Sequence, residues 1–154
     1  MNISYDFFTG AFLSKISEYE FIKLKEENRT AIIDDYMKRS FAAFKRNCNY
    51  DFLAAFNDET RAFNLDVEDE AKFKSELDEI ADIVSEGMVV QWLKPYAYKQ
   101  DLLESILNTR DFTTYSPAEL LKQVGSAYAK AQRDFTQMIR EYSYNHGKLT
   151  ELHL

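Results

Sequence analysis

The sequence predicts an all-α protein: a single domain of four to five helices, with a long C-terminal helix and an irregular central loop. Apolar residues recur three and four positions apart over most of the chain, which is the period of an amphipathic helix. The 154 residues include only four glycines and two prolines, too few for the many tight turns of an all-β protein. A chain of this length is expected to form one domain with its own core, so residues 1–154 are assigned to one unit.

The N-terminal third predicts two helices. Residues 5–16 form the first, because Phe8, Phe12 and Ile16 lie four apart on one side. Residues 17–25 alternate charged and apolar side chains and are interpreted as a connection. The second helix is predicted over residues 26–46, with acidic residues in its first turn and basic residues at its end, as the helix dipole favours. Its apolar side consists of Ile32, Ile33, Tyr36, Met37, Phe41 and Phe44.

The middle of the chain is harder to assign. In residues 47–75 the apolar positions do not repeat with a regular spacing for long, which predicts a loop-rich insertion. Any strand in the protein is expected here. A third helix is predicted over residues 76–94, with Ser75 as its cap and Pro95 ending or kinking it. A fourth is predicted over residues 96–107, followed by a polar and aromatic loop over residues 108–115.

The final helix has the clearest signals. Ser116 can cap it, Pro117 suits its first position, and Glu119 can close a capping box. We expect it to run from Pro117 to about residue 145, with residues 148–154 as a flexible tail. We expect its apolar stripe to meet other protein, with the first three of its residues packing within the chain. The stripe consists of Leu121, Val124, Tyr128, Ala131, Phe135, Met138 and Tyr142.

Charge and composition limit the function. The net charge is −7, and an acidic chain repels phosphate, so general affinity for nucleic acid is not expected. The basic residues of the last helix are interpreted as a solvated face: Lys122, Lys130, Arg133 and Arg140. One cysteine, no long apolar stretch and no signal-peptide pattern predict a soluble intracellular protein with no membrane contact.

No motif indicates chemistry. The two histidines, His146 and His153, lack the spacing of a metal site, and an acidic run from Asp66 fails as a calcium loop. Cys48 follows the basic end of a helix and is interpreted as an inert thiol. We therefore expect no enzyme activity, no catalytic residue, no metal and no cofactor. Gly87 and Gly125 lie inside helices, which predicts close approach of a neighbouring group at each.

Three segments together resemble small neck proteins of tailed bacteriophages, known as head-to-tail connectors, adaptors or head-completion proteins. The resemblance covers roughly residues 75–149, and the N-terminal helices more loosely, while residues 47–74 have no counterpart. None of the segments is a chemical signature. They are Gly87–Pro95 (GMVVQWLKP), Leu107–Ala118 (LNTRDFTTYSPA) and Met138–Gly147 (MIREYSYNHG).

The resemblance implies a virion structural protein, assembled in the host cytoplasm and located at the head–tail neck. Such proteins form a homo-oligomeric ring, often twelve-fold, between the portal protein and the next neck or tail component. DNA passes through the ring without specific binding. The residues predicted to make protein contacts are Arg110, Phe112 and Tyr115 in the loop, and Tyr142, Tyr144 and His146 at the end of the last helix.

A second hypothesis stays open at this point. The same C-terminal helix could serve a small helical regulator or adaptor that binds a host or phage protein. Loss of a connector leaves DNA-filled heads without tails, whereas loss of a regulator changes expression or timing, so the two hypotheses predict different phenotypes.

Overall fold

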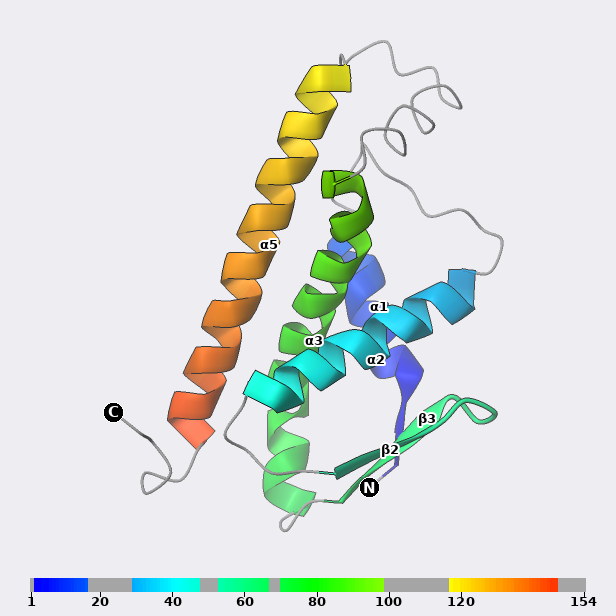
Figure 1. The fold of residues 1–154 in the computed structure, drawn as a ribbon. Coiled ribbons are helices and arrows are strands. Elements are labelled where there is room, and N and C mark those ends of the chain that lie inside the picture. The colour runs from blue at the N-terminus through cyan, green and yellow to red at the C-terminus, as the bar shows by residue number, and fades with distance from the viewer. Residues whose placement is uncertain (1, 17–28, 48–52, 67–69, 99–116, 147–154) are drawn as a thin grey trace.

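The predominantly helical fold is confirmed in a computed structural model that describes residues 2–16, 29–47, 53–66, 70–98 and 117–146 (Figure 1). Two of its four described helices, α3 with 29 residues and α5 with 30, are longer than α1 with 12 and α2 with 19. The helices are α1 (Tyr5–Ile16), α2 (Arg29–Asn47), α3 (Glu70–Tyr98) and α5 (Pro117–His146), and the strands are β1 (Asn2–Ser4), β2 (Leu53–Asn57) and β3 (Ala62–Asp66).

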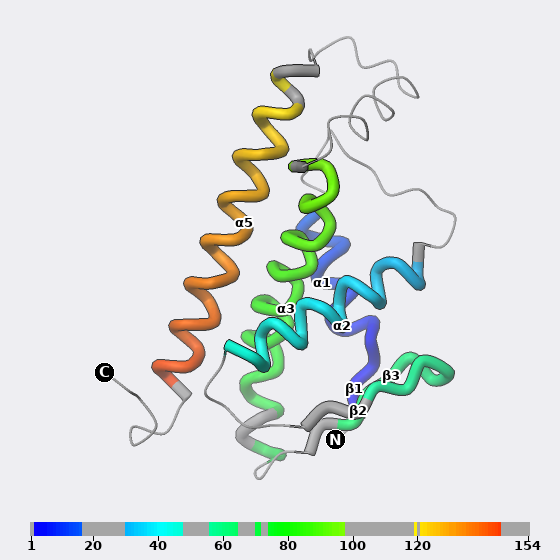
Figure 2. The backbone as a smooth tube through the Cα atoms, in the orientation of Figure 1, coloured from blue at the N-terminus to red at the C-terminus, as the bar shows by residue number. Residues whose placement is uncertain are grey.

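Helix α3 is the centre of the fold. It packs against α1, α2 and α5. It lies beside α5 along much of its length, and α2 crosses it obliquely (Figures 1 and 2). Its apolar residues surround much of the helix, as expected for a helix with neighbours on several sides. The buried ones are Ile80, Ala81, Ile83, Val84, Met88, Val89, Val90, Trp92 and Leu93.

Gly87 explains how the three helices come so close. A Cβ atom added there would meet the Ser40 hydroxyl oxygen of α2 and would lie 2.7 Å from the Phe135 ring of α5. The Ser40 hydroxyl in turn donates a 2.6 Å hydrogen bond to the backbone carbonyl of Val84. The close approach predicted at Gly87 is therefore confirmed. The same prediction is wrong for Gly125 within the described chain, because a Cβ there would meet nothing within 4 Å.

A three-stranded antiparallel sheet closes one end of the fold, in the order β1-β3-β2. Ile3 pairs with Phe63, and Phe63 pairs with Phe56, so these three side chains share one face of the sheet. Phe63 lies 5.2 Å from Phe8 of α1 and 5.4 Å from Phe41 of α2, measured between ring centroids. The aromatic residues thus join the sheet to the helices.

Most predicted helix boundaries agree with the structure, and the main corrections concern α3. It begins at Glu70, so Ser75 lies inside the helix and does not cap it. It also continues past Pro95 to Tyr98, because a proline in the last turn removes only one hydrogen bond. Residues 96–98 of the predicted fourth helix therefore belong to α3, and residues 99–107 lie outside the described residues.

Strands occur in the segment where the sequence pattern was weakest. Residues 53–66 form the β2–β3 hairpin, as expected if any strand were present, while β1 was not predicted. β1 has only three residues, too short for a period-two pattern to be read. It is held by pairing with β3, a contact between residues about 60 positions apart.

Candidate functional site

The apolar stripe of α5 is used within the chain. Val124 and Tyr142, near its two ends, are completely buried, Tyr128 and Ala131 are buried between them, and Phe135 is partly buried against the core. Contact with α3 therefore extends over most of α5 and is not confined to its first turns. The expectation that the later part of this stripe is free for another protein is wrong.

Tyr142 shows this most clearly. Its ring lies 5.3 Å from that of Phe44 in α2, and its hydroxyl donates a 2.9 Å hydrogen bond to the carboxyl group of Glu76 in α3. Glu76 is itself buried. We therefore remove Tyr142 from the predicted contact residues, because its side chain completes the core of its own chain.

The opposite side of α5 forms a second, continuous surface. Starting at Lys122, the residues spaced four or three apart are all exposed and lie on one side of the helix. From the first to the last the helix rises about 33 Å. We call this surface the α5 outer face; it consists of Lys122, Ser126, Ala129, Arg133, Thr136, Arg140 and Tyr144.

The α5 outer face is basic on an acidic protein. Its seven residues include Lys122, Arg133 and Arg140 and no carboxylate, whereas the whole chain has a net charge of −7; the exposed Glu119 precedes Lys122 by three positions on the same side of the helix. None of these three cations makes an ion pair among the residues that the structure describes. The fourth basic residue of the helix, Lys130, lies on its flank, with its Nζ 3.5 Å from a carboxylate oxygen of Asp134.

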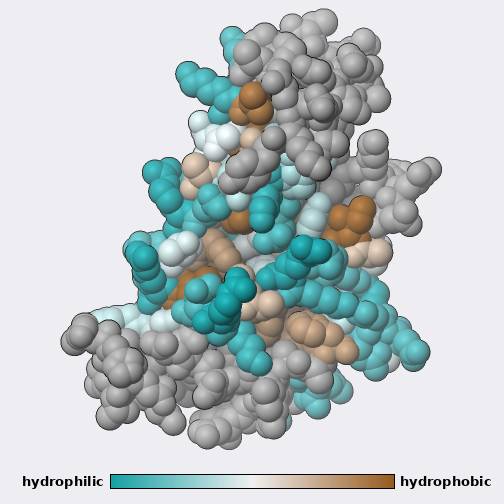
Figure 3. All heavy atoms as spheres, viewed as in Figure 1, coloured by the Kyte–Doolittle hydropathy of each residue, from teal (hydrophilic) through white to brown (hydrophobic). Residues whose placement is uncertain are grey.

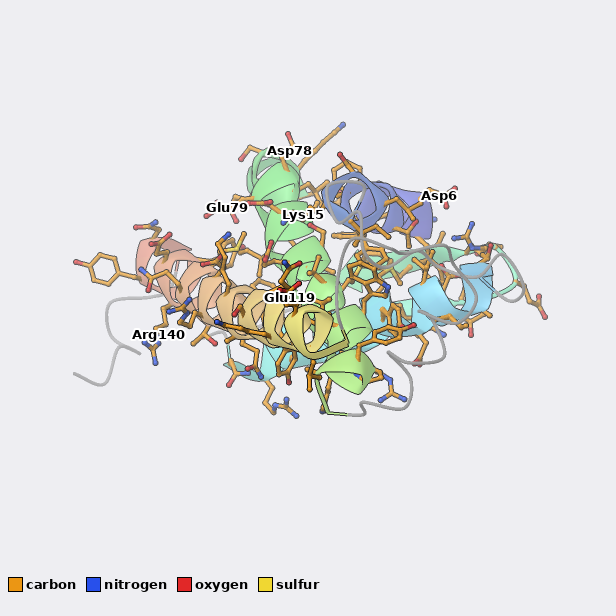
Figure 4. All side chains as sticks on the ribbon, turned by 90° about the horizontal axis from the view of Figure 1, so that it is seen from above. Asp6, Lys15, Asp78, Glu79, Glu119 and Arg140 are labelled. Atoms are coloured by element: carbon orange, nitrogen blue, oxygen red, sulfur yellow. The ribbon has the colours of Figure 1, made fainter. Side chains whose placement is uncertain are left out.

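Acidic side chains gather on another side of the molecule. Asp78, Glu79 and Asp82 are exposed on α3, and Asp78 projects from the side of the molecule opposite to Arg140 (Figure 4). Lys15 of α1 partly balances this surface, since its Nζ lies 2.8 Å from Asp82 and 3.0 Å from Glu86. Asp78 and Arg140 therefore lie on separate sides of the molecule, whereas Glu79 lies on the side of α3 nearer to α5 (Figure 4).

A polar groove lies between these two surfaces. It has a volume of about 460 Å³ and runs between α1, α3 and α5, with Lys15, Glu86 and Asp134 among its lining residues. Its carboxylates face lysines of the same chain, as the ion pairs of Lys15 show. No histidine or cysteine is among the described residues that line it.

The tip of the β2–β3 hairpin holds a dense group of ion pairs between described residues. Arg61, with a left-handed backbone (φ 50°), donates two 2.9 Å hydrogen bonds to Asp34 and one to Asp6, and these carboxylates raise its pKa. The Tyr5 hydroxyl donates to Asp58 at 2.9 Å, and burial together with this bond raises the pKa of Tyr5 to about 12. Hydrogen bonds from Lys38 and Tyr5 lower the pKa of Asp58. Since each partner is in the same chain, the group fixes the hairpin to α1 and α2.

Hydrophobic side chains do not form one docking patch on the described surface. The large exposed ones, Phe7, Ile32, Phe56 and Tyr144, belong to four different elements, and hydrophilic side chains separate the hydrophobic ones in the face shown in Figure 3. A groove of about 680 Å³ between β1 and the start of α3 includes Phe7. Apolar area alone therefore does not select a contact surface.

Of the remaining predicted contact residues, the structure describes the side chain of Tyr144 alone. Tyr144 is 72% exposed at the end of the α5 outer face. His146 is the last residue of α5, but its side chain lies outside the described residues, as do Arg110, Phe112, Tyr115 and Cys48. From the sequence, Arg133 and Arg140 were predicted only to be solvated. The signal for a separate surface was their spacing, which continues to Tyr144 without a carboxylate.

Known proteins do not identify the chain: no protein-family model, curated protein or solved structure matches it. Within the described residues, no group of three or more histidine, cysteine, aspartate or glutamate side chains is arranged to hold a metal ion. None of the described helices combines the length and the apolarity needed to cross a membrane.

Proposed function

We propose that this protein is a non-enzymatic structural component of a tailed-phage virion, a head-to-tail connector that forms a homo-oligomeric ring beneath the portal. The observation that carries the proposal is the α5 outer face. A 30-residue helix packs on the core with one side and leaves a continuous side of about 33 Å uncovered by any described element. A subunit of a ring needs such a surface for its neighbours.

The sequence resemblance supports the proposal at two levels. The segment Gly87–Pro95 lies in α3, where most of its side chains are buried, so likeness there reflects a shared core. The segment Met138–Gly147 includes Arg140 and Tyr144, which lie on the α5 outer face. Likeness in the second segment therefore involves a surface that could meet another subunit.

Net charge suits the passage of DNA. A wall rich in cations would hold the phosphate backbone through counterion release, and the DNA would then move through it slowly. The chain has 26 acidic and 19 basic residues. A ring of such subunits repels phosphate on average, so DNA can slide through it, while the portal and the next neck or tail component are held by protein contacts.

Deletion of the gene from its phage or prophage tests the proposal. We expect DNA-filled heads without attached tails, and tailed particles again when the wild-type gene is supplied from a plasmid. A second plasmid carrying an early stop codon controls for the plasmid itself. Tailed, infectious particles in the deletion strain, with only expression or timing changed, would contradict the proposal and favour a regulator.

A further inference from the structure

The α5 outer face has the shape for close approach of another helix. Three of its seven residues, Ser126, Ala129 and Thr136, have short side chains, and small residues let helix backbones come near each other. Gly125 lies beside them, with nothing within 4 Å of the position that a Cβ would take. Within the described residues, short side chains therefore leave the backbone of α5 accessible on this side, and long basic side chains lie between them.

Its charge selects an acidic occupant. Lys122, Arg133 and Arg140 have no ion-pair partner among the described residues, and like charges across an interface are strongly unfavourable. Two copies that met through the same face would bring these cations together. An isologous contact through the α5 outer face is therefore disfavoured, and a contact with a different surface is favoured.

The acidic surface of α3 is the complementary one. Asp78, Glu79 and Asp82 are exposed on a single helix, and Asp82 is also paired with Lys15 of α1. Asp78 projects from the side opposite to Arg140, and Glu79 lies nearer to α5 (Figure 4). A subunit can thus offer its basic side to one neighbour and its acidic side to another. Head-to-tail contacts of this kind close into rings or extend as filaments.

We propose that the α5 outer face of one copy docks on the acidic α3 surface of the next copy, which includes Asp78, Glu79 and Asp82. This inference rests on the proposed ring and names its subunit contact. Duplex DNA is the other acidic macromolecule to consider. Three cations over about 33 Å of an acidic chain are a weak phosphate-binding surface, so we favour the second copy.

Exchanging charges in the full-length protein tests the proposed contact between copies. One variant carries Arg133→Glu and Arg140→Glu, and another carries Asp78→Lys and Glu79→Lys. Sedimentation velocity would be measured at about 0.2 mM protein, a concentration suited to weak contacts, in about 0.05 M and about 0.5 M salt. All four residues are exposed, and circular dichroism with thermal melting checks that the variants fold.

The expected results compare the wild-type protein, each variant alone and the mixture of the two variants. Wild-type protein associates in low salt and less in high salt, and each variant alone associates about tenfold more weakly or worse. An equimolar mixture of the two variants regains association, because each basic surface again meets an acidic one. Lys45→Glu with Arg46→Glu, which makes the same charge change at the exposed end of α2, leaves association at the wild-type level.

Three outcomes would overturn the proposed contact: wild-type protein that stays monomeric in low salt, variants that associate normally, or a mixture that fails to recover. Binding of a short DNA duplex that depends on Arg133 and Arg140, without self-association, would also overturn it in favour of DNA. The connector role is judged separately by the deletion phenotype. If the charge-exchange experiment fails but the deletion strain makes tailless heads, only the proposed contact is refuted. If association depends on charge but the deletion strain makes normal tails, only the connector role is refuted.

Discussion

The hydroxyl of Tyr142 donates a 2.9 Å hydrogen bond to the carboxyl group of Glu76, and both residues are buried. The bond joins the last turns of α5 to the first turns of α3, at the end of the bundle where Phe44 of α2 also meets Tyr142. The C-terminal part of α5 is therefore held by the core, and the opposite side of the same turns, with Arg140 and Tyr144, is exposed at the surface.

We predict that Tyr142→Phe lowers the free energy of unfolding by about 1–3 kcal/mol, because a buried carboxyl group loses a hydrogen-bond donor. Urea denaturation monitored by circular dichroism measures the change. Tyr144→Phe is the matched control: it removes the same atom from a side chain that is 72% exposed, so it should change stability by less than about 0.5 kcal/mol. Equal effects of the two substitutions would contradict the structure.

Two glycines in helices should respond in opposite directions to alanine. Gly87→Ala places a methyl group 2.7 Å from the Phe135 ring and against the Ser40 hydroxyl, so we predict a loss of about 1–3 kcal/mol despite the better helix propensity. Gly125→Ala meets nothing within 4 Å and should stabilise the isolated protein by up to about 1 kcal/mol. Thermal melting of both variants gives the sign of each change, and stabilisation by Gly87→Ala would be inconsistent with the packing of α2, α3 and α5.

Arg61 should matter more for stability than another paired arginine. Arg61→Ala removes a two-pronged contact to Asp34, whose side chain is only 13% exposed, and we predict a loss of about 2 kcal/mol. Arg39→Ala breaks an exposed pair with Asp35 within α2 and should cost about 0.5 kcal/mol or less. Chemical denaturation of both variants makes the comparison. A cost for Arg61→Ala no larger than that for Arg39→Ala would show that the hairpin anchor is unimportant.

Stability should fall in alkaline solution partly through Tyr5. Its pKa is raised to about 12 in the folded protein by burial and by the bond to Asp58, and the value is about 10 in an unfolded chain. Between these values the unfolded chain loses a proton that the folded chain keeps, so stability present below pH 10 is lost as the pH rises toward 12. Tyr5→Phe should flatten this part of the stability curve. Burial also raises the pKa of Tyr36 and Tyr96, so some slope remains. An unchanged slope in Tyr5→Phe would contradict the assignment.

The helices could be predicted from the sequence because their apolar residues repeat with a helical period. Residues 5–16 were predicted as the structure has them, and the start of α5 at Pro117 followed from its capping residues. Ser75 and Pro95 misled the prediction of α3, because a local start signal and a local stop signal were outweighed by packing on both sides of the helix. β1 depends on pairing with β3, which no local pattern reveals.

The contact surface was less predictable than the fold. The apolar stripe of α5 was visible in the sequence, but a stripe does not state whether its partner is another helix of the same chain. Burial of Val124, Tyr128, Ala131 and Tyr142 shows that most of it is internal. The spacing of the α5 outer face was present in the sequence, but whether the core leaves this side uncovered was known only from the packing of α3 against α5.

Electron microscopy of the purified protein mixed with the portal protein of the same phage tests the central claim most directly. We predict a ring of additional density at the exit of the portal, into which α5 of each copy fits with its outer face toward the neighbouring copy. Arg133→Glu with Arg140→Glu should leave the fold intact and weaken this ring. Portals that show no added density at their exit in the presence of excess wild-type protein would contradict the account.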